Sequence, residues 1–122
     1  MGYELSWEPH GVVKRYLGQV TDEDLVQSVI EVGADARFDD LRYVIKDFSA
    51  CDAIAATPGC VEDIVIMDQG ASVSNPRIRI AVVAVQKEAL AIVEAYARFP
   101  LNPYPMRTFA TLPAARQWIG AS

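Results

Sequence analysis

The chain has 122 residues, of which 52% are hydrophobic, and its length and composition predict one globular domain (residues 1–122) with a single hydrophobic core. The formal net charge is −5, and the eleven basic residues are scattered along the sequence. This pattern excludes the basic surface of a nucleic-acid-binding protein.

The cysteines and the apolar runs indicate the compartment. Cys51 and Cys60 are too few for a disulfide scaffold, so we expect two free thiols in a reducing environment. The N-terminus has no basic region followed by an apolar stretch, and the longest apolar run, residues 80–85, is far too short to span a membrane. A soluble, cytoplasmic protein without a membrane span is therefore expected.

The first forty residues predict a hairpin followed by a helix. Residues 3–8 alternate between apolar and polar side chains, Pro9-His10-Gly11 forms a turn, and residues 12–17 continue as a second strand. Thr21 then caps a helix with three acids in its first turn, which Gly33 ends. Its expected buried stripe consists of Leu25, Val26, Val29 and Ile30.

The middle of the chain predicts a strand, a short loop and a second helix. Residues 43–48 form the strand, and Thr57 caps the helix with Pro58 at the first helical position. Residues 64–67 fit either a continuation of this helix or a short strand, because four apolar residues have no period of their own. Residues 70–76 are expected to form a loop.

The last third predicts strand, helix, strand and helix. Residues 77–85 are apolar on both faces, as in a central parallel strand, and residues 87–98 are helical up to the residues before Pro100. Residues 106–109 form a short last strand, and Thr111 caps the final helix. The third helix is expected to turn Leu90, Val93 and Ala97 inward.

Strands that are separated by helices pair in parallel through right-handed crossovers. The predicted fold is therefore α/β, with a mixed, mostly parallel sheet of about five strands, an antiparallel N-terminal edge strand and about four covering helices. Ligands of such sheets bind beyond the carboxyl ends of the strands, where residues 18–21, 47–57, Gln86 and residues 110–111 should gather. The free edge of the hairpin is compatible with a homodimer.

Catalytic and cofactor motifs are missing. The seven glycines do not form a dinucleotide or phosphate-binding loop, and the acids lack the spacing of a calcium loop. Cys60 lies in a first helical turn, but Glu62 and Asp63 oppose a thiolate there and His10 lies in a distant turn. We therefore expect no enzyme, no cofactor and no metal site.

Two other clusters have alternative interpretations. Phe99, Leu101 and Tyr104, which lie among three prolines, form either an exposed apolar lip for a ligand or partner or a satellite of the core. Four basic residues near the starts of two strands either form a small cationic strip or simply face solvent at strand ends or pair with acids: Arg42, Lys46, Arg77 and Arg79.

Four segments carry a family resemblance: GVVKRYLGQVTDEDL near the start, RFDDLRYVIKDFS in the middle, and RIRIAVVA and MRTFATLPAARQWI later on. Together they resemble the SpoIIAA-like family, within the wider STAS group of anti-sigma-factor antagonist and transporter-associated domains. The resemblance covers nearly the whole chain. It implies a STAS-like βαβ fold and a regulatory or ligand-binding role without catalysis.

The resemblance also implies a candidate switch. In STAS regulators a serine or threonine at the start of the helix after the third strand, in a pattern like Asp-Ser-Ser-Gly, is phosphorylated to change partner binding. The corresponding run here, counted from Asp47-Phe48-Ser49, is residues 55–58, in which only the hydroxyl of Thr57 matches. Thr57 and Ser49 are thus candidate phosphorylation sites, and the alternative role of Thr57 is an ordinary helix cap.

The leading functional hypothesis is a non-enzymatic STAS-like module that regulates through contacts with an unknown protein partner. The alternative is a carrier or sensor of a small hydrophobic or lipid-like ligand, held in a cavity near Leu90, Phe99 and Trp118. An enzyme whose site the sequence does not reveal is the third hypothesis.

Overall fold

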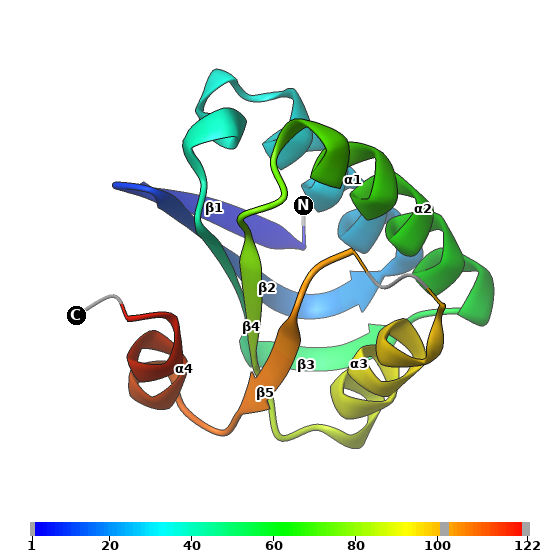
Figure 1. Ribbon diagram of the computed structural model, residues 1–122. Helices are drawn as coiled ribbons and strands as arrows, with labels where there is room; N and C mark the ends of the chain where they lie inside the picture. Colours follow the sequence, from blue (N-terminus) through cyan, green and yellow to red (C-terminus); the bar gives the residue numbers. More distant parts are fainter. Residues whose placement is uncertain (1, 101–102, 121–122) are drawn as a thin grey trace.

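A computed structural model describes residues 2–100 and 103–120 of the chain (Figure 1). The elements are β1 (Tyr3–Glu8), β2 (Gly11–Thr21), α1 (Asp22–Ala34), the 3-10 helix η1 (Ala36–Asp40), β3 (Tyr43–Ala55), α2 (Pro58–Ser74), β4 (Arg79–Val83), α3 (Lys87–Arg98), β5 (Met106–Phe109) and α4 (Leu112–Ile119). The strand order is β1-β2-β3-β4-β5. Only the β1–β2 pair is antiparallel, which confirms the predicted mixed sheet.

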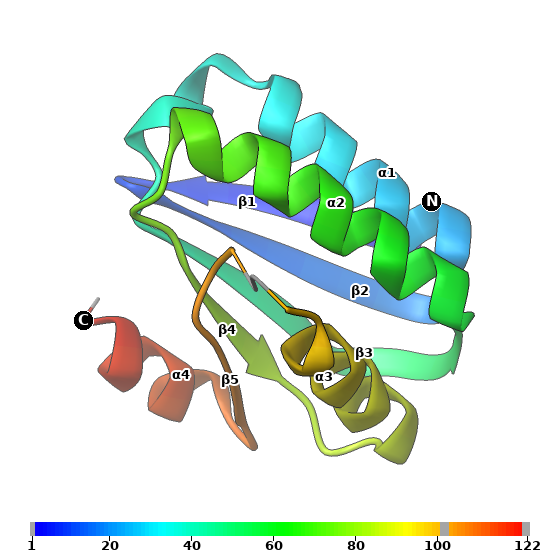
Figure 2. The same ribbon diagram turned by 45° about the vertical axis from the view of Figure 1, so that its right-hand side comes forward.

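The helices cover both faces of the sheet. Figures 1 and 2 show α1 and α2 side by side over one face, with α4 on the other side. Buried side chains of α1, α2 and α3 join the larger core cluster, whereas Ala115 and Ile119 of α4 pack in a smaller cluster with Val13, Ile45 and Val83. Alternate residues of β2, β3 and β4 therefore serve two separate cores.

The predicted helix starts are confirmed by their hydrogen bonds. The Thr21 hydroxyl accepts from the Asp24 backbone N–H, and the Asp24 carboxylate accepts from the Thr21 backbone N–H, so α1 begins with a complete capping box. Thr57 and Thr111 each accept a backbone N–H bond at the starts of α2 and α4. These short polar side chains fix where each helix begins.

The predicted short loop after residue 48 is wrong, because β3 continues to Ala55. Beyond Asp47 this strand has passed the end of β4 and pairs with β2 alone, up to the Thr21–Ala55 pair. Two register shifts interrupt that pairing, and Gly18 of β2 adopts a left-handed φ of 60° there. Such bulges break the alternation by which a strand is recognised in a sequence.

The predicted loop at residues 70–76 is also wrong, because α2 runs on to Ser74. Residues 64–67 belong to this helix, which resolves the ambiguity in favour of a helix. Gly70 lies in the helix interior with no atom within 4 Å of where a Cβ would be, so it marks neither a turn nor a close contact. A glycine at such a position costs the helix only about 1 kcal/mol, which the packing of α2 offsets.

The predicted buried faces of two helices are confirmed only in part. Leu25, Val26, Val29 and Val93 pack in or against the larger core cluster as predicted, whereas Ile30, Leu90 and Ala97 are exposed. On α3 the buried residues are Ala89 and Tyr96, while Leu90 is 40% exposed. On α1 the buried residues are Leu25, Ser28 and Val32, while Ile30 is 47% exposed. On α1 the polar Ser28 takes a buried position because its hydroxyl is hydrogen-bonded to the buried Tyr16 hydroxyl. Since successive residues of a helix point about 100° apart, burying Ser28 places Ile30 toward the solvent.

β1 and β5 form the two edges of the sheet, and the homodimer that we expected from the free hairpin edge stays a prediction. Within the described parts of the chain, no helix is both long enough and apolar enough to cross a membrane.

Asn75 ties together the segments at one end of α2. It is fully buried, and its side-chain N–H groups donate to the Phe38 and Leu41 carbonyls, both at 2.8 Å. Its side-chain oxygen accepts from the Arg77 N–H at 3.0 Å, and its backbone carbonyl accepts from the Tyr104 hydroxyl at 2.8 Å. Through its side chain and its backbone carbonyl, Asn75 thus joins η1, the end of α2 and the segments that precede β4 and β5.

We expect Asn75→Ala to lower the free energy of unfolding by about 2–4 kcal/mol, because two buried carbonyls lose their donors. Urea denaturation measures this loss. Asn75→Asp keeps the shape but replaces both donors with an oxygen, so it should be at least as damaging, whereas the exposed neighbour Ser74→Ala should change stability by less than about 0.5 kcal/mol. An Asn75→Asp protein as stable as the wild type would contradict this role.

Candidate functional site

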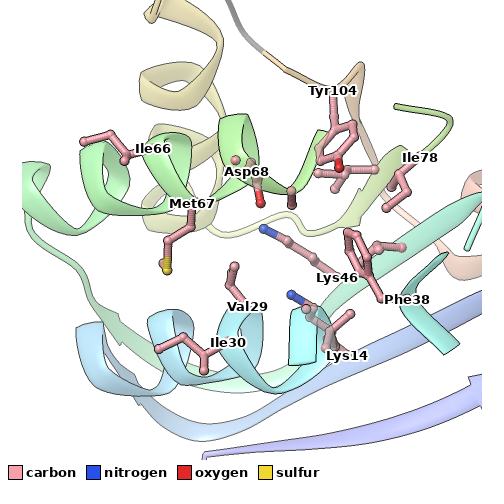
Figure 3. A pocket seen from close by; sticks show the side chains of 16 residues that line it. Lys14, Val29, Ile30, Phe38, Lys46, Ile66, Met67, Asp68, Ile78 and Tyr104 are labelled. Atoms are coloured by element: carbon pink, nitrogen blue, oxygen red, sulfur yellow. The ribbon is translucent and has the colours of Figure 1, made fainter. Parts of the chain in front are cut away.

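A cavity of about 300 Å³ lies between α1, α2 and the sheet (Figure 3). It is bounded by the carboxyl-terminal halves of both helices and by the amino-terminal halves of β2, β3 and β4. Its lining residues are Lys14, Val29, Ile30, Val32, Gly33, Phe38, Val44, Lys46, Ile66, Met67, Asp68, Gly70, Ala71, Ile78, Ile80 and Tyr104. Its volume is at the lower end of the range for ligand pockets.

Two lysines form the floor of this cavity. Lys14 of β2 and Lys46 of β3 are direct register partners, and both lie on the strand face that bears Val12, Tyr16, Val44 and Phe48. Their exposed fractions are only 3% and 9%. Figure 3 shows both nitrogen atoms pointing away from the sheet into the cavity. Neither ammonium has a hydrogen bond or an ion pair with any residue that the structure describes, and both nitrogen atoms are open to the water of the cavity.

Asp68 supplies the nearest opposite charge. It projects from α2, is 7% exposed, and its carboxylate accepts a hydrogen bond from the Tyr96 hydroxyl of α3 at 2.8 Å. Burial and the neighbouring Lys46, opposed by Asp68, together lower the pKa of Lys14 to about 7. When Lys14 is protonated, two ammonium groups and one carboxylate leave the cavity with one excess positive charge. Burial also lowers the pKa of Lys46.

The walls and the mouth of the cavity are apolar. Figure 3 shows Ile30 of α1 and Ile66 of α2 on opposite sides, and their exposed fractions of 47% and 57% are unusual for isoleucine. Between these residues and the lysines lie Val29 and Met67. The cavity is therefore amphipathic, with charges at its floor and hydrocarbon toward the solvent.

The predicted apolar lip at residues 99–104 turns out differently for each residue. Tyr104 is 3% exposed, lines the cavity and belongs to the core cluster, and Phe99 is half-buried and packs against that cluster. Both side chains therefore pack against the core instead of forming an exposed lip, and their contact with a ligand or partner stays a prediction. Leu101 lies outside the described residues.

The expected location of the ligand cavity, near Leu90, Phe99 and Trp118, is wrong. Trp118 lies on the opposite face of the sheet, where its ring packs 5.7 Å from that of Phe109, and Leu90 faces solvent. The cavity also lies toward the amino ends of the parallel strands, not at the rim of their carboxyl ends. It forms there because the carboxyl ends of α1 and α2 contribute small residues, Gly33, Gly70 and Ala71.

The carboxyl-end rim does assemble, but through structural contacts. The Gln86 side chain donates to the Phe48 and Cys51 carbonyls at 2.8 and 3.2 Å, which joins β3 to the start of α3. A second hollow of about 300 Å³ at this rim lies between α2 and α3, and its lining includes Thr57 and Pro58. The expected gathering of residues 47–57 with Gln86 is therefore confirmed.

Thr57 is exposed at the start of α2, and its partner is Asp22 at the start of α1. Its backbone N–H and its hydroxyl donate to the two Asp22 carboxylate oxygens at 2.8 and 2.7 Å. These bonds lower the pKa of Asp22. Ser49 lies within β3, where its N–H and hydroxyl both donate to the Asp47 carboxylate at 2.9 and 2.6 Å. Only Thr57 thus lies at a helix start, as the candidate switch requires.

The two cysteines are free and buried, as predicted. Burial and the nearby Asp22 raise the pKa of Cys60 to about 11, so the helix start does not make it a thiolate.

His10 is exposed in the hairpin turn, and its Nδ1 lies 2.9 Å from an Asp40 carboxylate oxygen. Across the described residues, no three His, Cys, Asp or Glu side chains come together as metal ligands would.

The sequence interpretation missed Lys14 and Asp68 and misplaced Lys46. We expected Lys46 in a cationic strip or in solvent, but it is buried, and Arg79 instead stacks 4.9 Å from the Trp118 ring on the other face. A usable signal was present: Val12-x-Lys14-x-Tyr16 and Val44-x-Lys46-x-Phe48 each place a lysine on the apolar face of a strand. No comparable signal identified Asp68.

We expect Lys14→Met to raise the free energy of unfolding at pH 6 by about 1–4 kcal/mol, because it replaces an unpaired buried charge with an apolar side chain of similar length. The pKa of Lys14 is about 7 in the folded protein, below its ordinary value of 10.5. Above pH 7, therefore, Lys14 holds a proton in the unfolded wild type more often than in the folded wild type. Wild-type stability therefore gains up to about 1.4 kcal/mol per pH unit between pH 7 and 9, and the advantage of the variant shrinks.

Urea denaturation of Lys14→Met and of the wild type at pH 6, 7, 8 and 9 measures the difference between their free energies of unfolding. Cysteines and tyrosines titrate in both proteins, so their contributions cancel in this difference. Lys87→Met makes the same substitution at an exposed position of α3 and should stay within about 0.5 kcal/mol of the wild type. A Lys14→Met protein that is less stable than the wild type at pH 6 would show that the ammonium has a stabilising partner.

No protein-family model matches the chain, and no curated protein matches its sequence. Solved structures do match its fold. The anti-sigma factor antagonist SpoIIAA in its unphosphorylated form aligns with a TM-score of 0.64 and 12% identity over 98% of this chain and 99% of that chain. The phosphorylated form of SpoIIAA, a Bacillus cell fate determinant, aligns with a TM-score of 0.62 and 14% identity over 96% and 98% of the two chains.

An uncharacterized protein of the DUF3478 family from Shewanella loihica PV-4, described as having a SpoIIAA-like fold, aligns with a TM-score of 0.52 and 14% identity, over 96% of this chain and 91% of that chain. At these identities the likeness concerns the fold. It agrees with the strand order and helix placement described above, and it confirms the architecture implied by the sequence resemblance. The chain has a STAS-type, SpoIIAA-like fold.

Proposed function

We propose that this protein is a non-enzymatic regulatory module that acts through contacts with another protein, and that a small ligand held between α1 and α2 sets those contacts. The observation that carries the proposal is the amphipathic cavity of about 300 Å³ beneath the two helices. The fold supports it, because the solved structures it resembles include an anti-sigma factor antagonist. As expected from the sequence, we place this function in the cytoplasm.

The geometry of α1 and α2 supports a link between the cavity and the surface. Near their amino ends the helices are held together by the Asp22–Thr57 hydrogen bonds. Toward their carboxyl ends the same helices form opposite walls of the cavity (Figure 3). A ligand that changes the spacing of the helices at one end would alter the surface that they present to a partner, since both are exposed on their outer sides.

The polar groups of the cavity are not arranged for catalysis. Asp68 is already engaged by the Tyr96 hydroxyl, and neither lysine has a hydrogen-bonded base among the described residues. Nucleophilic catalysis needs such a base within hydrogen-bonding reach of the nucleophile. This arrangement supports binding over an enzymatic role.

A second candidate function is a phosphorylation switch at Thr57, favoured by its exposure and its position at the start of α2. A related fold, SpoIIAA, is known in a phosphorylated form. A phosphate on Thr57 would add about −1.5 to −2 charges beside the Asp22 carboxylate and remove the hydroxyl donor. It would therefore separate the amino ends of α1 and α2. Ser49 stays a weaker candidate, because its hydroxyl is held by Asp47 within β3.

The ligand-binding part of the proposal is tested by isothermal titration calorimetry with 1-octanol, a neutral probe that is small enough for the cavity. We expect the wild type to bind 1-octanol, and Ala71→Phe to weaken this binding at least tenfold, because Ala71 lines the cavity and a benzyl group there occupies it. Val73→Leu is the control: Val73 is on the same helix, is 86% exposed and does not line the cavity. Equal binding of 1-octanol by Ala71→Phe and the wild type would contradict a ligand site here.

The switch is tested by affinity purification from cells of the source organism with quantitative mass spectrometry. We expect a partner that is recovered with the wild type to fall at least fivefold with Thr57→Glu, because the added carboxylate repels Asp22 and changes the surface at the start of α2. Loss of the cap should lower stability by only about 1 kcal/mol, so the variant stays folded. Ser74→Glu adds the same charge at the other end of α2 and should retain the partner. Equal recovery with Thr57→Glu would rule out the switch.

A further inference from the structure

We propose that the cavity between α1 and α2 binds a medium-chain carboxylic acid, with the carboxylate held by Lys14 and Lys46 and the hydrocarbon chain directed toward Ile30 and Ile66. This inference rests on the proposed function in that both need a ligand in the cavity. It adds the charge, the size and the orientation of that ligand.

The charge balance of the floor favours an anion. Two lysines that are 97% and 91% buried, as the exposed fractions of 3% and 9% imply, lie on neighbouring strands, and neither has a hydrogen bond or ion pair with the described residues. An uncompensated charge in a protein interior is unfavourable, and two like charges side by side are more so. Asp68 compensates one of them. A ligand with a single negative charge compensates the other.

The register of β2 and β3 favours a carboxylate over an anion of a single atom. Lys14 and Lys46 start from paired positions on strands that are about 4.8 Å apart. A carboxylate has two oxygens in a plane, so each oxygen accepts a charge-assisted hydrogen bond from a different ammonium. Figure 3 shows both ammonium groups on the same side of the sheet and facing the same space.

The walls require a hydrocarbon body. Going outward from the lysines, the side chains on both helices are aliphatic or thioether groups, including Val29 and Met67, and the exposed Ile30 and Ile66 flank the opening. A free inorganic anion would leave these surfaces in contact with water. A hydrocarbon chain that covers these surfaces removes them from water, which favours binding.

The volume sets the length of the chain. At about 30 Å³ for each water-sized unit, a cavity of about 300 Å³ accommodates about ten non-hydrogen atoms. Octanoate has that size. Longer acids would have to extend past Ile30 and Ile66 into solvent.

Isothermal titration calorimetry with four probes tests the inference: octanoate, 1-octanol, octylammonium and acetate. We expect octanoate to bind at least tenfold more tightly than 1-octanol, which has the same chain without the charge. Octylammonium should not bind, because its charge repels both lysines, and acetate should bind weakly, because it lacks the chain.

Lys14→Met and Lys46→Met should each weaken octanoate binding at least tenfold and leave 1-octanol binding unchanged or stronger. Neither substitution is expected to unfold the protein, since each removes a buried charge. Lys87→Met, at an exposed position of α3, should bind octanoate like the wild type.

Proton uptake provides a readout that a purely structural lysine would not give. The pKa of Lys14 is about 7 in the free protein, where it faces Lys46 from β3 and Asp68 from α2. At pH 8.5 a bound carboxylate would favour the charged amine, so octanoate binding should take up close to one proton. Buffers with different ionisation enthalpies measure this number, and it should vanish in Lys14→Met.

Equal affinity for octanoate and 1-octanol, together with unchanged octanoate binding by both lysine variants, would overturn the carboxylate assignment while the ligand site itself stands. If neither octanoate nor 1-octanol binds the wild type, the cavity is not a ligand site and the proposed function fails with it. Octanoate binding that Ala71→Phe leaves intact would place the acid elsewhere and would also overturn the inference.

Discussion

The in-register parallel pairing of β2 with β3 is the constraint on which the site depends. It places Lys14 beside Lys46 on the face that α1 and α2 cover, within a strand pattern that is otherwise apolar. A shift of one residue in either strand would turn its lysine to the opposite face, toward α4. The surrounding core fixes this register, because Val12, Tyr16 and their neighbours must also face the larger core cluster.

The two long helices close over this floor unequally. Their amino ends are held by the hydrogen bonds from Thr57 to Asp22, whereas their carboxyl halves carry Gly33, Gly70 and Ala71 where larger side chains would fill the space. The two helices are therefore held together at their amino ends and leave a cavity beneath their carboxyl halves. Asn75 and Tyr104 brace the hollow end without filling it.

Much of the architecture was predictable because it depends on local chemistry. Thr21, Thr57 and Thr111 mark helix starts through a hydroxyl that accepts a nearby N–H, and the alternation in β1 and the apolar run of β4 identify strands. The errors have equally physical causes. The bulges in β3 break the alternation, and the glycine in α2 was interpreted as a loop although helix packing tolerates it.

The sequence by itself determined the element order, the mixed sheet, the helix caps and the absence of recognisable catalytic motifs, because each follows from neighbouring residues. Only the tertiary structure decided where the cavity lies and which charges face it. Lys14, Lys46 and Asp68 come from three separate elements, and their meeting depends on strand register, helix rotation and the gap left by small residues. Those are properties of packing between distant segments, which no local pattern specifies.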